Sequence, residues 1–332
     1  MKTASLGVRF FTFTGRPFTK ALDNWPYLLD RSSMQLSNPS NQFASLAVLI
    51  AAAIWGLYWI PLRYLAGLGV REDWAVALIN IPAACVALIL FLWQLRSQLP
   101  HLRRGALIGI FMGLTVALFT IGLVLSSVVR VTLLFYLAPI WSTLIGSYWL
   151  KEDVTRGRWI AIAIGLLGLG FLVSQGGGQV PLNIGDVLGF LSGITWAVGG
   201  AMIKRYGEVP MPTLLLFQFC LASIFALLFG ALWGQASGPS LALLQQVAPA
   251  STVISIGIIL PSILIIFWAQ KFLFPGRVAL LMMTEVIVAT LTASWMLPQE
   301  AMGMLEWIGA CLIVGACVVE IFEAPAPQDA PT

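Results

Sequence analysis

The chain has 332 residues, of which 59% are hydrophobic and only 10% are charged. An ordinary soluble domain carries about 45–50% apolar and about 25% charged residues, so this composition excludes a soluble protein. Ten membrane-spanning helices would use about 200 residues at ~20 each. The apolar content matches that number, and the sequence therefore predicts an all-α polytopic membrane protein.

The charged and sulfur-containing residues exclude several function classes. The net charge of +4 comes without a Lys/Arg-rich run of the kind that binds phosphates, so no nucleic-acid partner is expected. The four cysteines lie in apolar stretches without metal-ligand spacing, and the single histidine, His101, lies in a short basic loop. We expect no metal site, no catalytic site and no cofactor. The motif G-x-x-x-x-G-K-[ST] is missing from the sequence, which excludes transport driven by an ATPase of its own.

Residues 1–43 differ in composition from the rest of the chain. They carry five basic and two acidic residues and no apolar core of signal-peptide type. We interpret them as an N-terminal cytoplasmic tail, with Met34 as an alternative initiator. A targeting peptide and an interfacial helix are the other readings.

Hydropathy divides the remaining chain into ten predicted spans with short connections. Residues 44–174 form a first five-helix repeat, 175–184 an external loop, 185–323 a second five-helix repeat and 324–332 a C-terminal cytoplasmic tail. The spans are 44–65, 74–94, 104–125, 130–150, 157–174, 185–205, 213–234, 251–272, 277–297 and 303–323.

The distribution of basic residues predicts the orientation of these spans. With the N-terminus inside, 15 Lys and Arg residues fall on one side of the membrane and three on the other. Under the positive-inside rule the side with 15 is cytoplasmic. Both termini are therefore predicted to be cytoplasmic, in agreement with an even number of spans.

The two halves of the chain repeat each other. At an offset of 147, residues 130–150 and 277–297 agree at nine of 21 positions. At an offset of 141, Trp55 corresponds to Trp196, and basic Arg63 corresponds to basic Lys204. Five spans per half force the second half to start from the opposite side of the membrane, so the repeats are inverted. Inverted repeats are typical of secondary transporters, which hold substrate near the midplane between the halves.

The repeated motifs resemble the EamA family of the drug/metabolite transporter superfamily, over residues from about 44 to 322. The residues that carry this resemblance are Trp55-Gly56, Arg63, Arg103-Gly105-Leu107-Gly109, Leu133-Leu134-Phe135-Tyr136-Leu137-Ala138-Pro139, Glu152, Glu300, Gly309 and Gly315. The resemblance implies a ten-helix carrier of the bacterial inner membrane that moves small organic solutes, often outward. The sequence departs from the family at Val286, where a proline is common, so no proline kink is expected in the ninth span.

Glu285 is the sharpest candidate for a site residue. It lies eight residues into the ninth span, about 12 Å deep at 1.5 Å per residue. A carboxylate at that depth costs at least ~2.5–3.5 kcal/mol, and such residues usually mark a substrate or proton pathway. We expect Glu285 to act in coupling or cation recognition, with interhelical packing as the alternative.

Aromatic residues near span centres are candidates for the walls of a binding cavity. Aromatic belts explain tryptophans at span ends but not those at span centres. The central residues can stack on a flat or cationic solute, or can simply fill the helix bundle. They are Trp55, Tyr58, Trp59, Tyr136, Trp141 and Trp196.

Two amides and two basic residues complete the candidate set. Asn80 and Gln218 lie at corresponding places in the two halves, where amides can orient a substrate or join helices. Arg63 and Lys204 lie at span ends, where snorkelling to the interface competes with a gating role.

The function predicted from these features is secondary transport of a small organic solute, such as an amino acid, a metabolite or a drug-like compound. By resemblance the direction is export by alternating access. A membrane-embedded enzyme and a nucleotide-sugar carrier of the same superfamily are the alternatives. The expected partners are the solute and the lipid bilayer, and both a monomer and a homodimer are compatible with the sequence.

Overall fold

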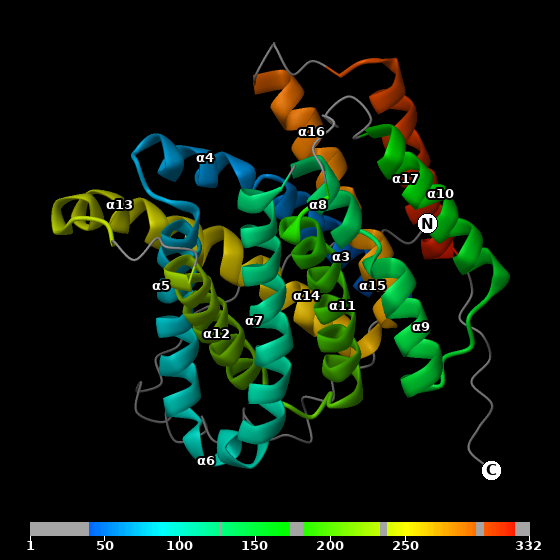
Figure 1. Ribbon diagram of the computed structural model, residues 1–332. Coiled ribbons are helices and arrows are strands. Elements are labelled where there is room, and N and C mark those ends of the chain that lie inside the picture. Colours follow the sequence, from blue (N-terminus) through cyan, green and yellow to red (C-terminus); the bar gives the residue numbers. More distant parts are fainter. Residues whose placement is uncertain (1–39, 127, 173–181, 233–237, 297–301, 323–332) are drawn as a thin grey trace, which may run out of the picture. The chain divides into compact units, whose positions relative to one another are not determined.

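The computed structural model describes residues 40–126, 128–172, 182–232, 238–296 and 302–322. Every regular element in these residues is helical (Figure 1). Nine helical spans in the described part of the chain are long and apolar enough to cross a membrane. The helix α10, with 17 residues, lies at the place of the fifth predicted span. The prediction of an all-α membrane protein is confirmed. Residues 1–39 of the predicted N-terminal tail, the predicted C-terminal tail and most of the loop 175–184 lie outside the described residues. Residues 41–43, which were predicted as part of the tail, belong to the first helix instead.

The first repeat contains α3 to α10. Their bounds are α3 Asn41–Gly56, α4 Trp59–Gly67, α5 Glu72–Trp93, α6 Leu95–Gln98, the short 3₁₀ turn Leu99–His101, α7 Leu102–Leu125, α8 Val128–Phe135, α9 Ala138–Leu150 and α10 Arg156–Leu172. The helices α3 and α4 together form the first predicted span, and α8 and α9 together form the fourth.

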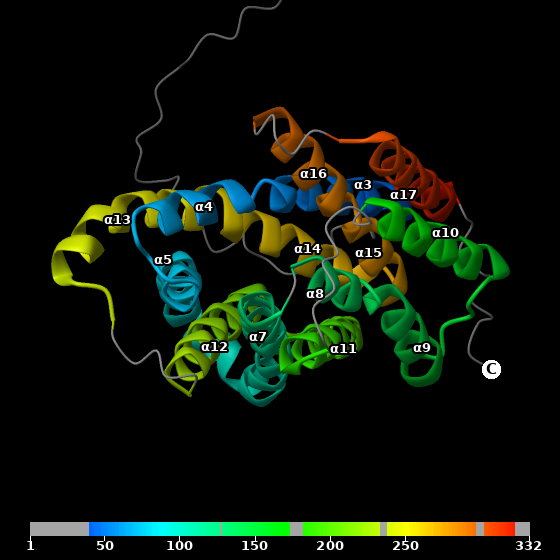
Figure 2. The same ribbon diagram turned by 45° about the horizontal axis from the view of Figure 1, so that its top comes forward.

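The second repeat contains α11 to α17. Their bounds are α11 Ile184–Arg205, α12 Met211–Leu232, α13 Leu241–Ile254, the π-helical segment η2 Ser255–Ile259, α14 Leu260–Phe272, α15 Pro275–Met282, α16 Thr284–Met296 and α17 Met304–Phe322. In Figures 1 and 2, α5, α7, α11 and α12 run side by side, and α13 projects to one side.

Four of the ten predicted spans are interrupted in the structure. The first breaks at Leu57-Tyr58, the fourth at Tyr136-Leu137 and the ninth at Met283, and a π-helical turn divides the eighth. The fourth-span and ninth-span breaks correspond at the offset of 147. Pro139 explains the first of these, because it lies in the first turn of α9 and cannot continue the preceding helix. The ninth span breaks at the corresponding position although residue 286 is a valine. The break is therefore shared by the two repeats and does not depend on a proline.

Pairs of polar contacts follow the two-fold relation between the repeats. Arg130 Nε of α8 lies 3.2 Å from Asp186 Oδ1 of α11. At the corresponding place, Arg277 Nε of α15 donates to Ser45 Oγ of α3 over 2.9 Å. We call the end of the bundle where α3 begins and α17 ends the proximal end, and the opposite end the distal end. The Arg277 contact lies at the proximal end and the Arg130 contact at the distal end, as inverted repeats require.

Helices of opposite repeats pack on each other throughout the bundle. The helix α7 packs on α11 and α12, α5 on α12, α9 on α15, α3 on α14 and α16, and α10 on α17. The α10–α17 pair is especially close, because a Cβ added at Gly168 would lie 2.7 Å from the Gly309 carbonyl oxygen. Small residues of this kind allow helix backbones to approach within a membrane.

Candidate functional site

A cavity of about 350 Å³ lies between the two repeats. Residues of α4, α5, α7 and α8 line it from the first repeat, and residues of α11, α12, α14 and α15 from the second. The lining extends from Ala138 and Ala279 near the bundle centre to Val70 and Leu123 near the distal end. The volume is at the lower end of the range for small-molecule pockets, so it suits a small solute.

Aromatic side chains form much of the cavity wall, and several of them sit at the helix breaks. Trp55 and Tyr58, on either side of the α3–α4 break, are stacked with ring centroids 5.1 Å apart. Phe135 packs edge-on against Tyr136 at 5.1 Å and against Trp196 at 6.5 Å. An interrupted helix therefore brings neighbouring rings to one face of the cavity.

The carboxyl group of Glu285 lies at the cavity, immediately after the break in the ninth span. The Tyr136 hydroxyl donates a hydrogen bond to Glu285 Oε1. The other oxygen, Oε2, is buried and has no hydrogen-bond partner among the described residues. Glu285 is the second residue of α16, where the positive end of the helix dipole favours a negative charge. Glu285 therefore offers one acceptor atom to a cation, a proton or a hydrogen-bond donor.

The two predicted amides line the same cavity from α5 and α12. Asn80 is 5% exposed and Gln218 is 3% exposed. Asn80 Nδ2 donates to the Val76 carbonyl over 2.7 Å, whereas Gln218 Oε1 is buried without a hydrogen-bond partner in the described chain. The amide oxygen of Gln218 is thus a second acceptor available to a bound solute.

Three of the predicted site residues do not line the cavity. Trp59 Nε1 donates to Thr292 Oγ1 over 3.0 Å, which joins α4 to α16. Trp141 packs edge-on against Phe190, with centroids 5.5 Å apart. Lys204 Nζ donates to the Phe272 carbonyl at the proximal end. The structure instead brings together Trp55, Tyr58, Arg63, Asn80, Tyr136, Trp196, Gln218 and Glu285.

Arg63 and Lys204 occupy corresponding sequence positions but different surroundings. Arg63 lines the cavity toward its distal side. Lys204 lies with Nζ 5.0 Å from the centre of the Phe274 ring. These two basic residues therefore have different surroundings at the two ends of the bundle.

The sequence analysis missed polar and aromatic residues that the structure places at the site. Thr115 of α7 lines the cavity, and its hydroxyl lies 2.9 Å from the Thr195 hydroxyl of α11. Phe119 and Phe135 line it as well, with centroids 4.9 Å apart. A hydroxyl at the middle of an apolar span was a usable signal for Thr115, whereas phenylalanines are too common in such spans to be informative.

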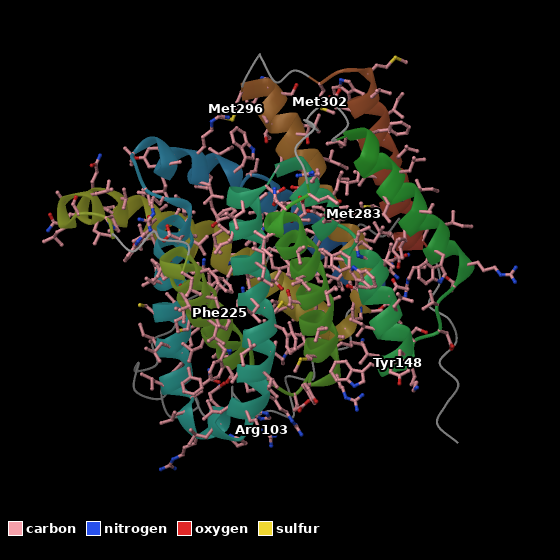
Figure 3. All side chains as sticks on the ribbon, in the orientation of Figure 1. Arg103, Tyr148, Phe225, Met283, Met296 and Met302 are labelled. Atoms are coloured by element: carbon pink, nitrogen blue, oxygen red, sulfur yellow. The ribbon has the colours of Figure 1, made fainter. Side chains whose placement is uncertain are left out.

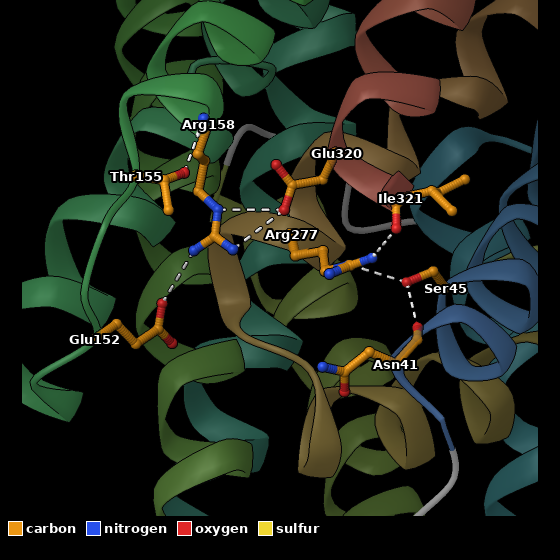
Figure 4. Close-up of polar contacts among 8 residues, drawn as sticks. All are labelled: Asn41, Ser45, Glu152, Thr155, Arg158, Arg277, Glu320 and Ile321. Atoms are coloured by element: carbon orange, nitrogen blue, oxygen red, sulfur yellow. Dashed lines mark hydrogen bonds and ion pairs between the residues drawn. The ribbon is translucent and has the colours of Figure 1, made fainter. Parts of the chain in front are cut away.

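A buried charged cluster at the proximal end was also missed. Arg158 of α10 lies 3.2 Å through both Nε and Nη2 from Glu320 Oε1 of α17, and 3.5 Å through Nη1 from Glu152 Oε2 (Figure 4). The Glu152 and Glu320 side chains are completely buried. Close to them, Arg277 donates to the Ile321 carbonyl and to Ser45. The sequence signal that could have revealed this cluster is the presence of charged residues, Glu320 above all, within apolar segments.

Glu152 lies in the connection between α9 and α10, and its buried carboxyl group has few polar partners. Both its carboxylate oxygens are buried without hydrogen bonds in the described part of the structure. Burial raises the pKa of Glu152 from 4.5 to about 8, although the charges of Arg158 and Lys204 act in the opposite direction. The group is therefore the titratable member of the cluster near neutral pH.

Comparison with known proteins identifies the family. The model of the EamA-like transporter family matches residues 42–174 and 183–321, one match for each repeat. An uncharacterized transporter of Bacillus subtilis (strain 168), YyaM, is 26% identical over 133 residues, which is 37% of this chain and 44% of that protein. The match thus spans less than half of the relative.

A solved structure has the same fold. It is described only as a crystal structure of a protein, and it aligns with a TM-score of 0.66 and 19% identity over 85% of this chain and 98% of the other. At that identity the likeness concerns the fold alone. The two family matches cover most of the sequence, in the places where the repeats were predicted. The chain belongs to the EamA-like transporter family.

Proposed function

We propose that this protein is a secondary carrier that exports a small organic solute by alternating access. The solute binds in the cavity between the repeats, and Glu285 recognises a cationic group or carries a coupling proton. The carrier lies in the bacterial inner membrane with both termini in the cytoplasm, so that the distal end faces outward.

The observation that carries this proposal is the cavity with Glu285 in its wall. Both repeats contribute to its wall, as expected of a carrier that rocks one repeat against the other. Helix breaks at Tyr136-Leu137 and Met283 place unusual backbone at the same depth as the carboxylate. Irregular backbone at membrane depth is tolerated where it is buried in protein or lines a cavity.

The lining does not favour a nucleotide-sugar carrier. Arg63 is the one basic residue among the described residues that line the cavity. A diphosphate would need more positive charge than this single guanidinium supplies. The aromatic wall and the free acceptors on Glu285 and Gln218 suit a small solute that carries hydrogen-bond donors on an apolar body.

Proteoliposome flux with and without an imposed pH gradient tests the role of Glu285. Glu285→Gln keeps the size of the side chain but fixes it neutral. We expect the variant to insert normally and to lose gradient-driven accumulation, while exchange of solute survives. Glu208→Gln removes an exposed carboxylate at the proximal end and serves as the control that transports normally.

The cavity assignment has an independent test. Trp55→Ala and Trp196→Ala each remove an aromatic wall residue, and each should weaken solute binding by about tenfold, since aromatic stacking contributes ~1 kcal/mol or more beyond buried area. Trp141→Ala removes an aromatic residue that does not line the cavity and should leave binding unchanged. Unchanged transport in both wall variants, at normal expression, would reject the assignment.

A further inference from the structure

Phe274 lies between two cations at the proximal end of the bundle. It follows Leu273 in the two-residue connection between α14 and α15, and it immediately precedes Pro275. Lys204 Nζ of α11 lies 5.0 Å from the centre of the ring, and the Arg158 guanidinium carbon of α10 lies 5.8 Å from it. One phenyl ring therefore contacts cationic groups from both repeats.

Both cations are held in place by other groups. Arg158 bonds to Glu320 of α17 and lies beside Glu152, as Figure 4 shows. Lys204 donates to the Phe272 carbonyl, two residues before the ring. Charged groups with little access to water are costly, and a cation–π contact is strongest where the cation is desolvated. The arrangement is therefore more than a fortuitous contact of a flexible surface lysine.

Phe274 is not among the residues that line the cavity. Ala279, which lines it, is five residues after Phe274 and so about 7.5 Å farther along the chain at 1.5 Å per residue. Between them, α15 packs on α9, where a Cβ added at Gly276 would lie 3.2 Å from the Thr143 Cα. The start of α15, which directly follows Phe274, therefore lies between the cavity residue Ala279 and the proximal end.

The distal end has no such arrangement in its sequence. At the offset of 147 the position of Phe274 corresponds to Ser127, and at the offset of 148 Arg158 corresponds to Glu306. Only the basic residue is repeated, because Arg63 corresponds to Lys204, and Arg63 lines the cavity. The aromatic residue with its two cations is thus specific to the proximal end.

We propose that Phe274, held by Lys204 and Arg158, is the proximal gate of the carrier. The ring must leave the two cations before the cavity opens at the proximal end. Its contacts with them set the fraction of protein molecules that are closed at that end. The inference rests on the proposed function, because it assumes that the cavity opens alternately at the two ends.

Side-specific labelling of a cavity cysteine tests the gate without any knowledge of the solute. Ala279→Cys places a thiol in the cavity, and an impermeant maleimide is applied from the proximal side in membrane vesicles. Peptide mass spectrometry quantifies this thiol separately from the four native cysteines. In the parent the reaction from the proximal side is slow. Phe274→Leu keeps an apolar side chain but removes the cation–π contacts, and should accelerate the reaction by about tenfold.

Two further variants separate the cation–π contacts from side-chain volume and from general destabilisation. Phe274→Trp retains an aromatic face and should label as slowly as the parent. Tyr148→Leu removes a similar contact, in which Lys151 Nζ lies 5.4 Å from an exposed ring at the same end, and should change nothing. Figure 3 shows Tyr148 at the edge of the molecule on α9.

The result that overturns the gate is a proximal labelling rate within about twofold of the parent in Phe274→Leu. Equal acceleration in Phe274→Trp would do the same, because it would mean that any change at this position loosens the end. If Phe274→Leu does not fold, as judged by gel filtration, Lys204→Met decides: it keeps the ring, removes one cation and should accelerate labelling to a smaller extent. Labelling requires no solute, so a failed gate and a failed transport assay are distinguishable.

Discussion

The third helix of the first repeat and its counterpart in the second repeat pack differently. In α7, a glycine every four residues meets α12: a Cβ added at Gly109 would lie 2.9 Å from the Phe217 carbonyl carbon, and one at Gly113 would lie 2.9 Å from the Ala222 nitrogen. At the offset of 147 the corresponding segment is α13, η2 and α14, where Gly109 is replaced by Ile256 and Gly113 by Leu260. Met112 and Ile259 also correspond, and both line the cavity, which supports this alignment.

The two repeats therefore pack differently at corresponding helices. Glycines let α7 lie directly against α12 through the proximal half of the bundle. The counterpart segment has Ile256 and Leu260 in place of two of these glycines, and α13 projects to one side of the bundle (Figure 2). The Arg158 cluster and Phe274 distinguish the proximal end further.

The largest effect is expected when the proximal cluster loses its cation. Arg158→Met leaves the Glu152 and Glu320 carboxylates buried without their common partner, which costs about 3–5 kcal/mol of unfolding free energy. Thermal unfolding in detergent measures the loss. Arg104→Met breaks an exposed ion pair with Glu208 at the same end and should cost less than ~1 kcal/mol. Equal losses in the two variants would contradict the importance of the buried cluster.

The close packing of α7 on α12 can be disrupted at one glycine. Gly109→Ala places a Cβ against the Phe217 backbone, and overpacking of this kind costs about 1–3 kcal/mol. The matched variant in the second repeat is Gly257→Ala in η2, where nothing lies within 4 Å of the added atom. Its melting temperature should stay the same or rise, because alanine favours a helix more than glycine by ~1 kcal/mol. A larger loss in Gly257→Ala than in Gly109→Ala would reverse the assignment of the closely packed helix.

A smaller effect concerns the irregular segment that replaces the straight helix. Ser255 Oγ in η2 accepts a hydrogen bond from the Ala83 backbone nitrogen over 2.9 Å, and Ser255 is fully buried. Ser255→Ala removes this hydrogen bond between η2 and α5 and should cost about 1 kcal/mol. Ser223→Ala removes a buried hydroxyl that bonds only within its own helix, to the Phe219 carbonyl, and should cost less. A melting temperature equally lowered in both variants would show that the contact between α5 and η2 has no special role.

The sequence predicts the fold well because its signals are repeated and cumulative. Length, hydropathy and the motif beginning at Arg130 and Arg277 locate the ten spans and the two repeats. The helix breaks are not predictable in the same way, because Met283 interrupts the ninth span without a proline or any other helix-breaking residue at that position. Hydropathy places a residue at a depth but not on a face, which is why Trp141 and Trp59 were grouped with residues that line the cavity.

The candidate site, like the fold, was predictable only where the sequence carries a local signal. Glu285 was identifiable because a carboxylate within a span is rare and costly, and Tyr136 because aromatic belts do not explain a tyrosine near a span centre. Its hydrogen bond with Glu285 joins residues 149 positions apart and has no local signal. Phe274 has none either, because an aromatic residue before a proline at a span end usually belongs to the aromatic belt. Only the two cations next to its ring, Lys204 and Arg158, distinguish Phe274 from such a residue.

The smallest effect is a dependence of stability on pH that arises at Glu152. Desolvation raises the pKa of this carboxyl to about 8 in the folded protein, from 4.5 without burial. The folded state therefore holds the Glu152 proton more tightly than the unfolded chain. The stability that this proton supplies is fully present below pH 4.5 and is lost as the pH rises through about 8. Glu152→Gln removes the titration, so its melting temperature should exceed that of the parent above pH 8 by roughly 2–4 °C.

The comparison across pH isolates this group from the rest of the cluster. Below pH 5 the parent carries a neutral Glu152, and the parent and Glu152→Gln should unfold at nearly the same temperature. The difference between them should grow as the pH rises from 5 to 9. Because the glutamine leaves Arg158 bonded to Glu320, the cluster stays intact throughout. A difference that is constant with pH, or one that decreases toward pH 9, would mean that Glu152 stays ionised beside Arg158 and that the ion pair outweighs the cost of burial.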